Sequence, residues 1–102
     1  MRALNVRILP QFEDDLAGIL DYIAYHLVNP DAAAKLAGDV FQAIRDRALD
    51  PRAFEPVYSE KPRQDVYYPI RVRNYTIVYV VIDTVMEVRR IFYTPANWRV
   101  QL

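Results

Sequence analysis

Residues 66–93 read VYYPIRVRNYTIVYVVIDTVMEVRRIFY and decide the fold of this chain. The stretch is rich in Val, Ile, Tyr and Phe, which favour β-strands. It is interrupted only at Arg73-Asn74 and at Asp83-Thr84. Short polar interruptions between apolar runs are typical of tight turns. The stretch therefore predicts three consecutive strands that pair as an antiparallel meander.

The first and second of these strands differ in their side-chain pattern. In the first strand, one face is expected to carry Tyr68, Ile70 and Val72, and the other face Tyr67, Pro69, Arg71 and Arg73, because successive side chains point to opposite faces. The second strand, residues 75–82, is apolar on both faces apart from Thr76 and the tyrosine hydroxyls. A strand of this kind is typical of a sheet covered on both sides.

The residues before the meander predict that cover. Residues 3–9 alternate as a strand that joins the later sheet. Apolar residues then recur at helical spacing over residues 11–27 and 30–48. Asn29-Pro30-Asp31 supplies an N-cap, a proline for the first helical position and a carboxylate for the first turn. We therefore expect one α+β domain over residues 1–102, ordered β-α-α-β-β-β, with a helical hairpin packed on one face of a mostly antiparallel four-stranded sheet.

The chain has two glycines, Gly18 and Gly38, and both fall inside the predicted helices. Each lies off the apolar stripe of its helix and costs about 1 kcal/mol relative to alanine. Either these are tolerated surface positions, or a partner's backbone approaches closely there. The sequence is compatible with both explanations.

The composition excludes several kinds of site. The chain has no cysteine, which excludes disulfides and thiolate metal sites, and it has one histidine, His26, and no glycine-rich phosphate loop. His26 is expected at the end of the first helix, where a positive charge opposes the helix dipole. We expect no metal and no cofactor. Because no long apolar run or signal-like N-terminus is present, we expect a cytoplasmic protein without a membrane contact.

The charge of the chain is zero overall but unevenly distributed. Residues 1–60 carry 6 Lys/Arg and 10 Asp/Glu, a net charge of −4, whereas residues 61–102 carry 7 and 3, a net charge of +4. The meander therefore belongs to the cationic half. This asymmetry is compatible with an anionic partner on the meander side and also with a solvated mixed surface.

The order and spacing of these pieces resemble the RelE/ParE superfamily of bacterial toxins. The resemblance rests on an opening strand, a helical hairpin with YIAYHLVNPDAA at its bend, the segment RVRNYTIVYVV, and VRRIFY followed by Asn97-Trp98, and it spans about Val6 to Trp98. It implies a growth-arresting toxin that a cognate antitoxin neutralises. It also implies that the toxin reaches operator DNA only through the DNA-binding part of that antitoxin.

The resemblance leaves the target open between ribosome-bound mRNA and DNA gyrase. RelE-like members cleave mRNA, which requires a base, a cation and an acid around the phosphate. The resemblance assigns these roles to Arg71, Arg73 and Tyr93. The paired arginines of the family's tail are replaced here by residues 94–98, and Thr76 stands where RelE has an arginine. The loss of these cations predicts weak ribonuclease activity.

ParE-like members inhibit gyrase and need no catalytic residues. The long helical hairpin and the neutral net charge favour this branch, because proteins that bind the ribosome are generally more basic. We therefore favour gyrase inhibition over mRNA cleavage, and the third alternative is an inactive relative retained for antitoxin binding or promoter control. The candidate contacts with target or antitoxin are Arg71, Arg73, Arg90, Tyr93 and Trp98.

Overall fold

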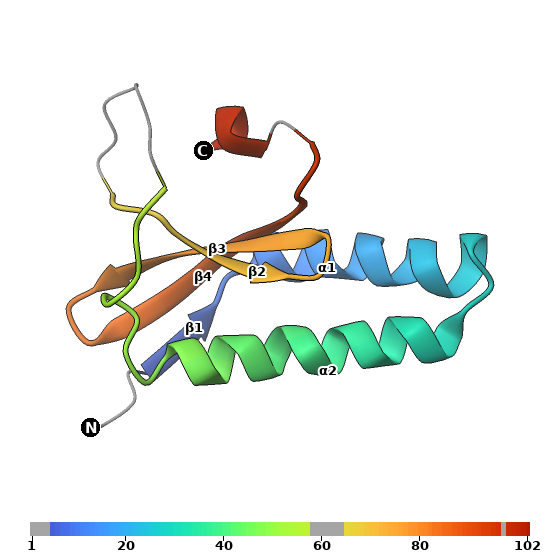
Figure 1. The fold of residues 1–102 in the computed structure, drawn as a ribbon, viewed down its shortest axis with the longest axis horizontal. Helices are drawn as coiled ribbons and strands as arrows, with labels where there is room; N and C mark the ends of the chain where they lie inside the picture. Colours follow the sequence, from blue (N-terminus) through green and yellow to red (C-terminus); the bar gives the residue numbers. More distant parts are fainter. Residues whose placement is uncertain (1–4, 58–64, 97) are drawn as a thin grey trace.

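A computed structural model describes residues 5–57, 65–96 and 98–102, and its fold has two main layers (Figure 1). An antiparallel pair of helices covers one face of a four-stranded sheet. In chain order the elements are β1 (Asn5–Ile8), α1 (Pro10–Asp21), the π-helical turn η1 (Tyr22–His26), α2 (Pro30–Arg47), β2 (Tyr68–Val72), β3 (Tyr75–Ile82), β4 (Val85–Tyr93) and the 3₁₀-helix η2 (Trp98–Gln101). The predicted α+β class and the order β-α-α-β-β-β are confirmed.

The strands lie in the order β1-β4-β3-β2 across the sheet. β3 is antiparallel to both of its neighbours, whereas β1 runs parallel to β4 with Ile8 opposite Val88. The two turns of the meander fall where they were predicted, and Arg73 and Asp83 have φ angles of 53° and 54°. A positive φ at the first turn residue suits a two-residue hairpin. The first strand joins the sheet as expected, and residues 3 and 4 of that prediction lie outside the described residues.

The bounds of both helices agree with the sequence, but the last turn of the first helix is π-helical rather than α-helical. Asn29 caps α2, because its Oδ1 accepts a hydrogen bond from the amide of Ala32 at 3.1 Å. The first helix ends its α-helical part at Asp21 and continues as a π-helical turn, in which the Leu27 amide donates to the Tyr22 carbonyl at 3.1 Å. The chain then leaves through Val28, which has a φ of 51°. Glycine usually occupies such a position, and in this chain a valine occupies it.

The main core lies between the helices and the sheet. Its buried residues are Phe12, Leu16, Leu36, Val40, Ile44, Ala48, Ile70, Val72, Ile77, Tyr79, Met86, Val88 and Ile91. The hydroxyl of Tyr79 donates to the Pro51 carbonyl at 2.6 Å and accepts from Nη1 of Arg47 at 3.1 Å, so this buried polar atom has partners. The hairpin therefore covers the face of the meander that carries Ile70 and Val72, as predicted.

The other face of the sheet has a smaller cover of its own. Val78, Phe92 and Trp98 are buried there, and Val57, Tyr67 and Leu102 pack against them. The rings of Phe92 and Trp98 stack with centroids 5.8 Å apart. In Figure 1, η2 lies on the side of the sheet away from α2. This second cluster explains why β3 is apolar on both faces.

The helical hairpin is longer than the sheet that it covers. In Figure 1 its closed end, formed by η1 and the first turns of α2, extends beyond the turn between β2 and β3. Tyr25, Leu27 and Val28 are exposed there. None of the helices in the described ranges combines the length and hydropathy needed to cross a bilayer. These apolar side chains are thus left uncovered at one end of the molecule.

Candidate functional site

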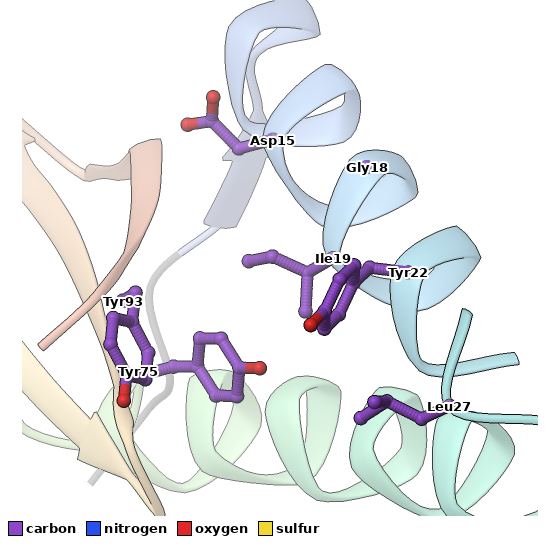
Figure 2. A pocket seen from close by; sticks show the side chains of 7 residues that line it. All are labelled: Asp15, Gly18, Ile19, Tyr22, Leu27, Tyr75 and Tyr93. Carbon is purple, nitrogen blue, oxygen red and sulfur yellow. The ribbon is translucent and has the colours of Figure 1, made fainter. Parts of the chain in front are cut away.

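A groove opens where the closed end of the hairpin extends past the sheet (Figure 2). It has a volume of about 670 Å³ and is lined by Asp15, Gly18, Ile19, Tyr22, Leu27, Tyr75 and Tyr93. The first helix and the turn after it supply one wall, and the ends of β3 and β4 supply the other. The lining residues include no lysine and no arginine. The groove is therefore an aromatic and aliphatic surface with a single carboxylate.

The helical wall comes from one side of α1 and η1. Asp15, Gly18 and Tyr22 follow one another at intervals of three and four residues, which places them on the same side of the helix. Gly18 contributes no side chain, so the wall is open at that point. One turn further along, the ring of Tyr22 stacks on His26 with centroids 5.3 Å apart. The wall thus changes from open to aromatic toward the end of the hairpin.

The sheet wall is a pair of tyrosines. Tyr75 is the first residue of β3 and lies opposite Tyr93, the last residue of β4. Their rings meet edge to face, with centroids 6.0 Å apart. Burial raises the pKa of Tyr75, and the nearby phenols of Tyr93 and Tyr22 raise this pKa further. Tyr75 therefore stays a neutral phenol at physiological pH and is poorly suited to act as a general base.

The carboxylate of Asp15 already accepts hydrogen bonds from other groups of the same chain. Arg90 donates from Nε to Oδ2 at 2.7 Å and from Nη2 to Oδ1 at 3.1 Å. The amide of Ile91 donates to Oδ2 at 3.2 Å. A bidentate pair of this kind is among the stronger side-chain contacts. Asp15 therefore joins α1 to β4 and brings no free charge to the groove.

The two arginines expected to share a face of the first meander strand lie apart. Arg71 is exposed, on the face of β2 opposite to Ile70 and Val72, and makes no hydrogen bond or ion pair with another described residue. Arg73 belongs to the turn after β2, and its guanidinium pairs with Asp39 on α2. The turn ends the alternation of the strand, because the backbone at Arg73 has a positive φ. The expectation that Arg71 and Arg73 face the same way is wrong.

The other predicted site residues are also distributed over the molecule. Arg90 is paired with Asp15, and Tyr93, which is 51% exposed, lines the groove. Trp98 is only 2% exposed and packs in the second cluster. The predicted residues are thus not gathered into one site, and their roles in target or antitoxin binding stay predictions. Asn97, which belonged to the resemblance, lies outside the described residues.

Most of the positive charge of the meander is neutralised by neighbouring groups. Arg89 donates to Glu87 at 2.9 Å, to Asp65 at 3.0 Å and to the Tyr67 hydroxyl at 3.2 Å. Burial lowers the pKa of Arg89, but these hydrogen bonds outweigh burial and raise the pKa. Among the arginines of the described ranges, Arg71 is the one with no described partner. Of the four arginines in the meander, Arg73, Arg89 and Arg90 are therefore paired with carboxylates, and Arg71 is not.

Sequence reasoning missed most of the groove. Tyr22 and Tyr75 were not singled out as site residues, and the pairing of Asp15 with Arg90 has no local signal because 75 residues separate the two. A usable signal was the repeat of Gly18, Tyr22 and Tyr25 on the side of the first helix away from its apolar stripe. In the described part of the chain, no three His, Asp or Glu side chains are grouped so that they could hold a metal ion.

Comparisons with known proteins identify similar folds and the family of this chain. The structure is similar to a chain of the chromosomal ParDE toxin–antitoxin system from P. aeruginosa, with a TM-score of 0.73, 16% identity, and coverage of 89% of this chain and 96% of that one. It is also similar to a chain of the toxin–antitoxin complex RelBE2 from Mycobacterium tuberculosis, with a TM-score of 0.57, 21% identity, and coverage of 90% and 99%. No curated protein sequence matches. A sequence model described as the ParE toxin of the type II toxin–antitoxin system parDE matches residues 6–98. The chain therefore belongs to the ParE toxin family of type II toxin–antitoxin systems.

Proposed function

We propose that this toxin arrests growth by binding DNA gyrase and catalyses no reaction itself. The proposal is supported by the match to the ParE family rather than to a RelE-like one, because the resemblance to ParE-like members implies gyrase inhibition. The main supporting observation is the lack of positively charged side chains in the groove beside Tyr93. The groove that Tyr93 lines contains no lysine or arginine, and the arginine nearest in sequence, Arg90, is held by Asp15.

This arrangement argues against RNA cleavage. Attack by a 2′-hydroxyl places negative charge on the phosphate, and a missing stabilising donor typically lowers the rate by about 10²–10³. Arg73 pairs with Asp39, and Arg71 lies on the face of β2 opposite to the helices, whereas Tyr93 lines the groove on the helix side. Thr76 is buried and its hydroxyl pairs with that of Thr94. The residues that a ribonuclease would need together are therefore apart.

One observation favours the RelE-like alternative, a ribosome-dependent mRNA endoribonuclease. Arg71 is exposed and uncommitted, so it is available to a phosphate group. A single cation without a neighbouring base is a binding contact rather than a catalytic centre. We therefore assign Arg71 to target binding and rank mRNA cleavage second. An inactive relative retained for antitoxin binding is the third candidate.

We also propose a cognate antitoxin as the partner that keeps the toxin inactive. Both similar solved structures come from toxin–antitoxin systems. The uncovered apolar end of the hairpin supports this proposal, because exposed Tyr25, Leu27 and Val28 suit contact with another protein. Operator DNA would then be reached through the antitoxin, and both partners act in the cytoplasm.

The test is expression of the chain with and without the antitoxin encoded beside it. Gyrase inhibition predicts growth arrest, double-strand breaks and induction of the SOS response, and co-expressed antitoxin should prevent all three. In vitro, the purified chain should inhibit DNA supercoiling by purified gyrase. Codon-position cleavage of mRNA with unaffected supercoiling would favour the ribonuclease, and normal growth without antitoxin would favour the inactive relative.

A further inference from the structure

The indole N–H of Trp98 is buried without a hydrogen-bond partner. Trp98 is 2% exposed, and its Nε1 atom donates to no acceptor. Thr76 and Glu87, the polar residues buried in the described ranges, both have hydrogen-bond partners. An unsatisfied buried donor destabilises the state that contains it and calls for an explanation. The buried position of Trp98 is therefore not the most favourable one for its N–H group.

Residues 98–102, called the tail below, are attached to the sheet through their side chains. The tail consists of the single 3₁₀ turn η2 and Leu102, and it lies on the side of the sheet away from α2 (Figure 1). Outside η2 its described backbone hydrogen bonds run from the Trp98 amide to the Ala96 carbonyl and from the Leu102 amide to the Arg99 carbonyl. Neither bond reaches a strand. The geometry of 3₁₀ hydrogen bonds is also poorer than that of α-helical ones.

The packing beneath the tail is much smaller than the main core. In the described ranges the second cluster buries three residues, Val78, Phe92 and Trp98, whereas the main core buries thirteen. Segments with few buried apolar contacts open at a lower free-energy cost than the rest of a fold. The tail is therefore the part of the sheet's cover that can leave while the helices and strands stay folded.

Release of the tail would uncover one continuous surface on the sheet. Thr76 of β3 is paired with Arg71 of β2 on one side and with Phe92 of β4 on the other, so these three side chains share one face. Val78 lies two residues further along β3 and belongs to the same face. Phe92 and Val78 are buried together with Trp98, whereas Arg71 is already exposed and has no described partner. The uncovered surface would thus be apolar with one available cation at its border.

We infer that the tail is a detachable cover, and that gyrase binds the sheet face from which the tail is released. The inference rests on the proposed function, because it assigns gyrase to one surface of the toxin. A protein suits this face better than DNA, since a single available cation neutralises few phosphates and apolar side chains favour a protein contact. The matching surface of gyrase is apolar, with a carboxylate that faces Arg71. Release also gives the N–H group of Trp98 access to water, which offsets part of the lost packing.

The first test loosens the tail without changing the surface beneath it. Leu102→Ala removes a side chain that packs against the second cluster, and the matched control Leu49→Ala removes an exposed leucine that does not belong to this cluster. The apparent affinity for gyrase depends on the fraction of toxin molecules with a released tail, so a looser tail should bind more tightly. We expect Leu102→Ala to inhibit supercoiling at a toxin concentration about three- to tenfold lower than the wild type requires. Leu49→Ala should inhibit like the wild type.

The sign of the change separates this inference from a purely structural role of the tail. A tail that only stabilises the fold predicts weaker inhibition by Leu102→Ala, and this result would overturn the inference. Inhibition by Leu102→Ala at the wild-type concentration would overturn it as well, and both results leave the proposed function intact. Melting temperatures of the two variants check that both proteins fold. If the wild-type chain does not inhibit gyrase, the proposed function and this inference both fail.

The second test follows the tail itself in the full-length toxin. Trp98 is the single tryptophan of the chain, so hydroxytryptophan incorporated there can be excited apart from the tryptophans of gyrase. Acrylamide should quench this label weakly in the free toxin, because Trp98 is buried, and as strongly in the complex with gyrase as in the urea-unfolded chain. Weak quenching in a complex that still blocks supercoiling would overturn the inference alone. Plasmid DNA without gyrase should leave the label protected, and exposure by DNA alone would contradict a protein occupant.

Discussion

The two ends of the helical hairpin differ in what covers them. Over the sheet, Phe12, Val40 and Ile44 are almost completely buried, whereas Leu27, which continues the apolar stripe of the first helix to its closed end, is 56% exposed. The difference arises because the sheet ends near Tyr75 and Tyr93 while the helices continue beyond it (Figure 1). Apolar periodicity therefore identifies the side of a helix that needs a cover, but not the molecule that provides it.

The largest effect should come from removing a side chain at the covered end. Ile44→Ala is expected to lower the free energy of unfolding by about 3 kcal/mol, because it leaves a cavity under the sheet. Tyr25→Ala at the uncovered end should change it by less than about 0.5 kcal/mol. Urea unfolding followed by circular dichroism measures both. Similar losses for the two variants would mean that the closed end is packed as tightly as the covered end.

The ion pair between Asp15 and Arg90 joins the first helix to β4. Asp15→Asn should lower the free energy of unfolding by about 1 to 2 kcal/mol, because it leaves the mostly buried guanidinium of Arg90 without its charged partner. The matched control is Asp14→Asn, which removes an exposed carboxylate with no described partner and should cost less than about 0.5 kcal/mol. Equal effects in urea unfolding would show that the pair does not hold α1 to β4.

A substitution at Val28 is expected to stabilise the protein rather than to destabilise it. It has a φ of 51°, which costs a residue with a side chain about 1 to 2 kcal/mol. Val28→Gly should therefore raise the free energy of unfolding by about 1 kcal/mol, net of the greater freedom of glycine in the unfolded chain. Leu27→Gly is the control, because Leu27 has a φ of −90° and should lose stability instead. A destabilised Val28→Gly variant would contradict the strained conformation of the hairpin's closed end.

The secondary structure of this chain was predictable because its signals are local. Asn29-Pro30 marks a helix start by capping chemistry, and the polar pairs at Arg73-Asn74 and Asp83-Thr84 mark turns by their position between β-branched runs. The π-helical last turn of the first helix and the positive φ of Val28 had no such local signal. Val28 adopts a conformation that its side chain disfavours, so tertiary and loop geometry overrode the local preference there.

The candidate site was harder to predict because it depends on contacts distant in sequence. Asp15 and Arg90 are neutralised by each other, and Arg73 by Asp39, although each of these residues reads as a free charge in the sequence. The groove also requires the hairpin to extend past the sheet. That feature depends on where the ends of β3 and β4 lie beneath α1, and no local pattern encodes this position.

The smallest change in stability is expected at the two arginines of the meander. Arg71→Ala should leave the free energy of unfolding within about 0.5 kcal/mol, because the side chain is exposed and has no described partner. Arg73→Ala should lose no more than about 0.5 kcal/mol, because its pair with Asp39 is solvent-exposed. Stability therefore hardly distinguishes the two variants, and melting temperatures can confirm that both fold.

Function should separate these two arginines. If the target meets the sheet face opposite to the helices, Arg71→Ala alone should weaken inhibition of gyrase supercoiling, and Arg73→Ala should leave it unchanged. Equal loss of inhibition in both variants would place the target contact across the β2–β3 turn, where Arg73 lies. Full inhibition by both variants would remove this face from target binding. The uncovered end of the hairpin would then be the leading candidate for the target contact as well as for the antitoxin contact, and direct competition for one surface would explain how the antitoxin neutralises the toxin.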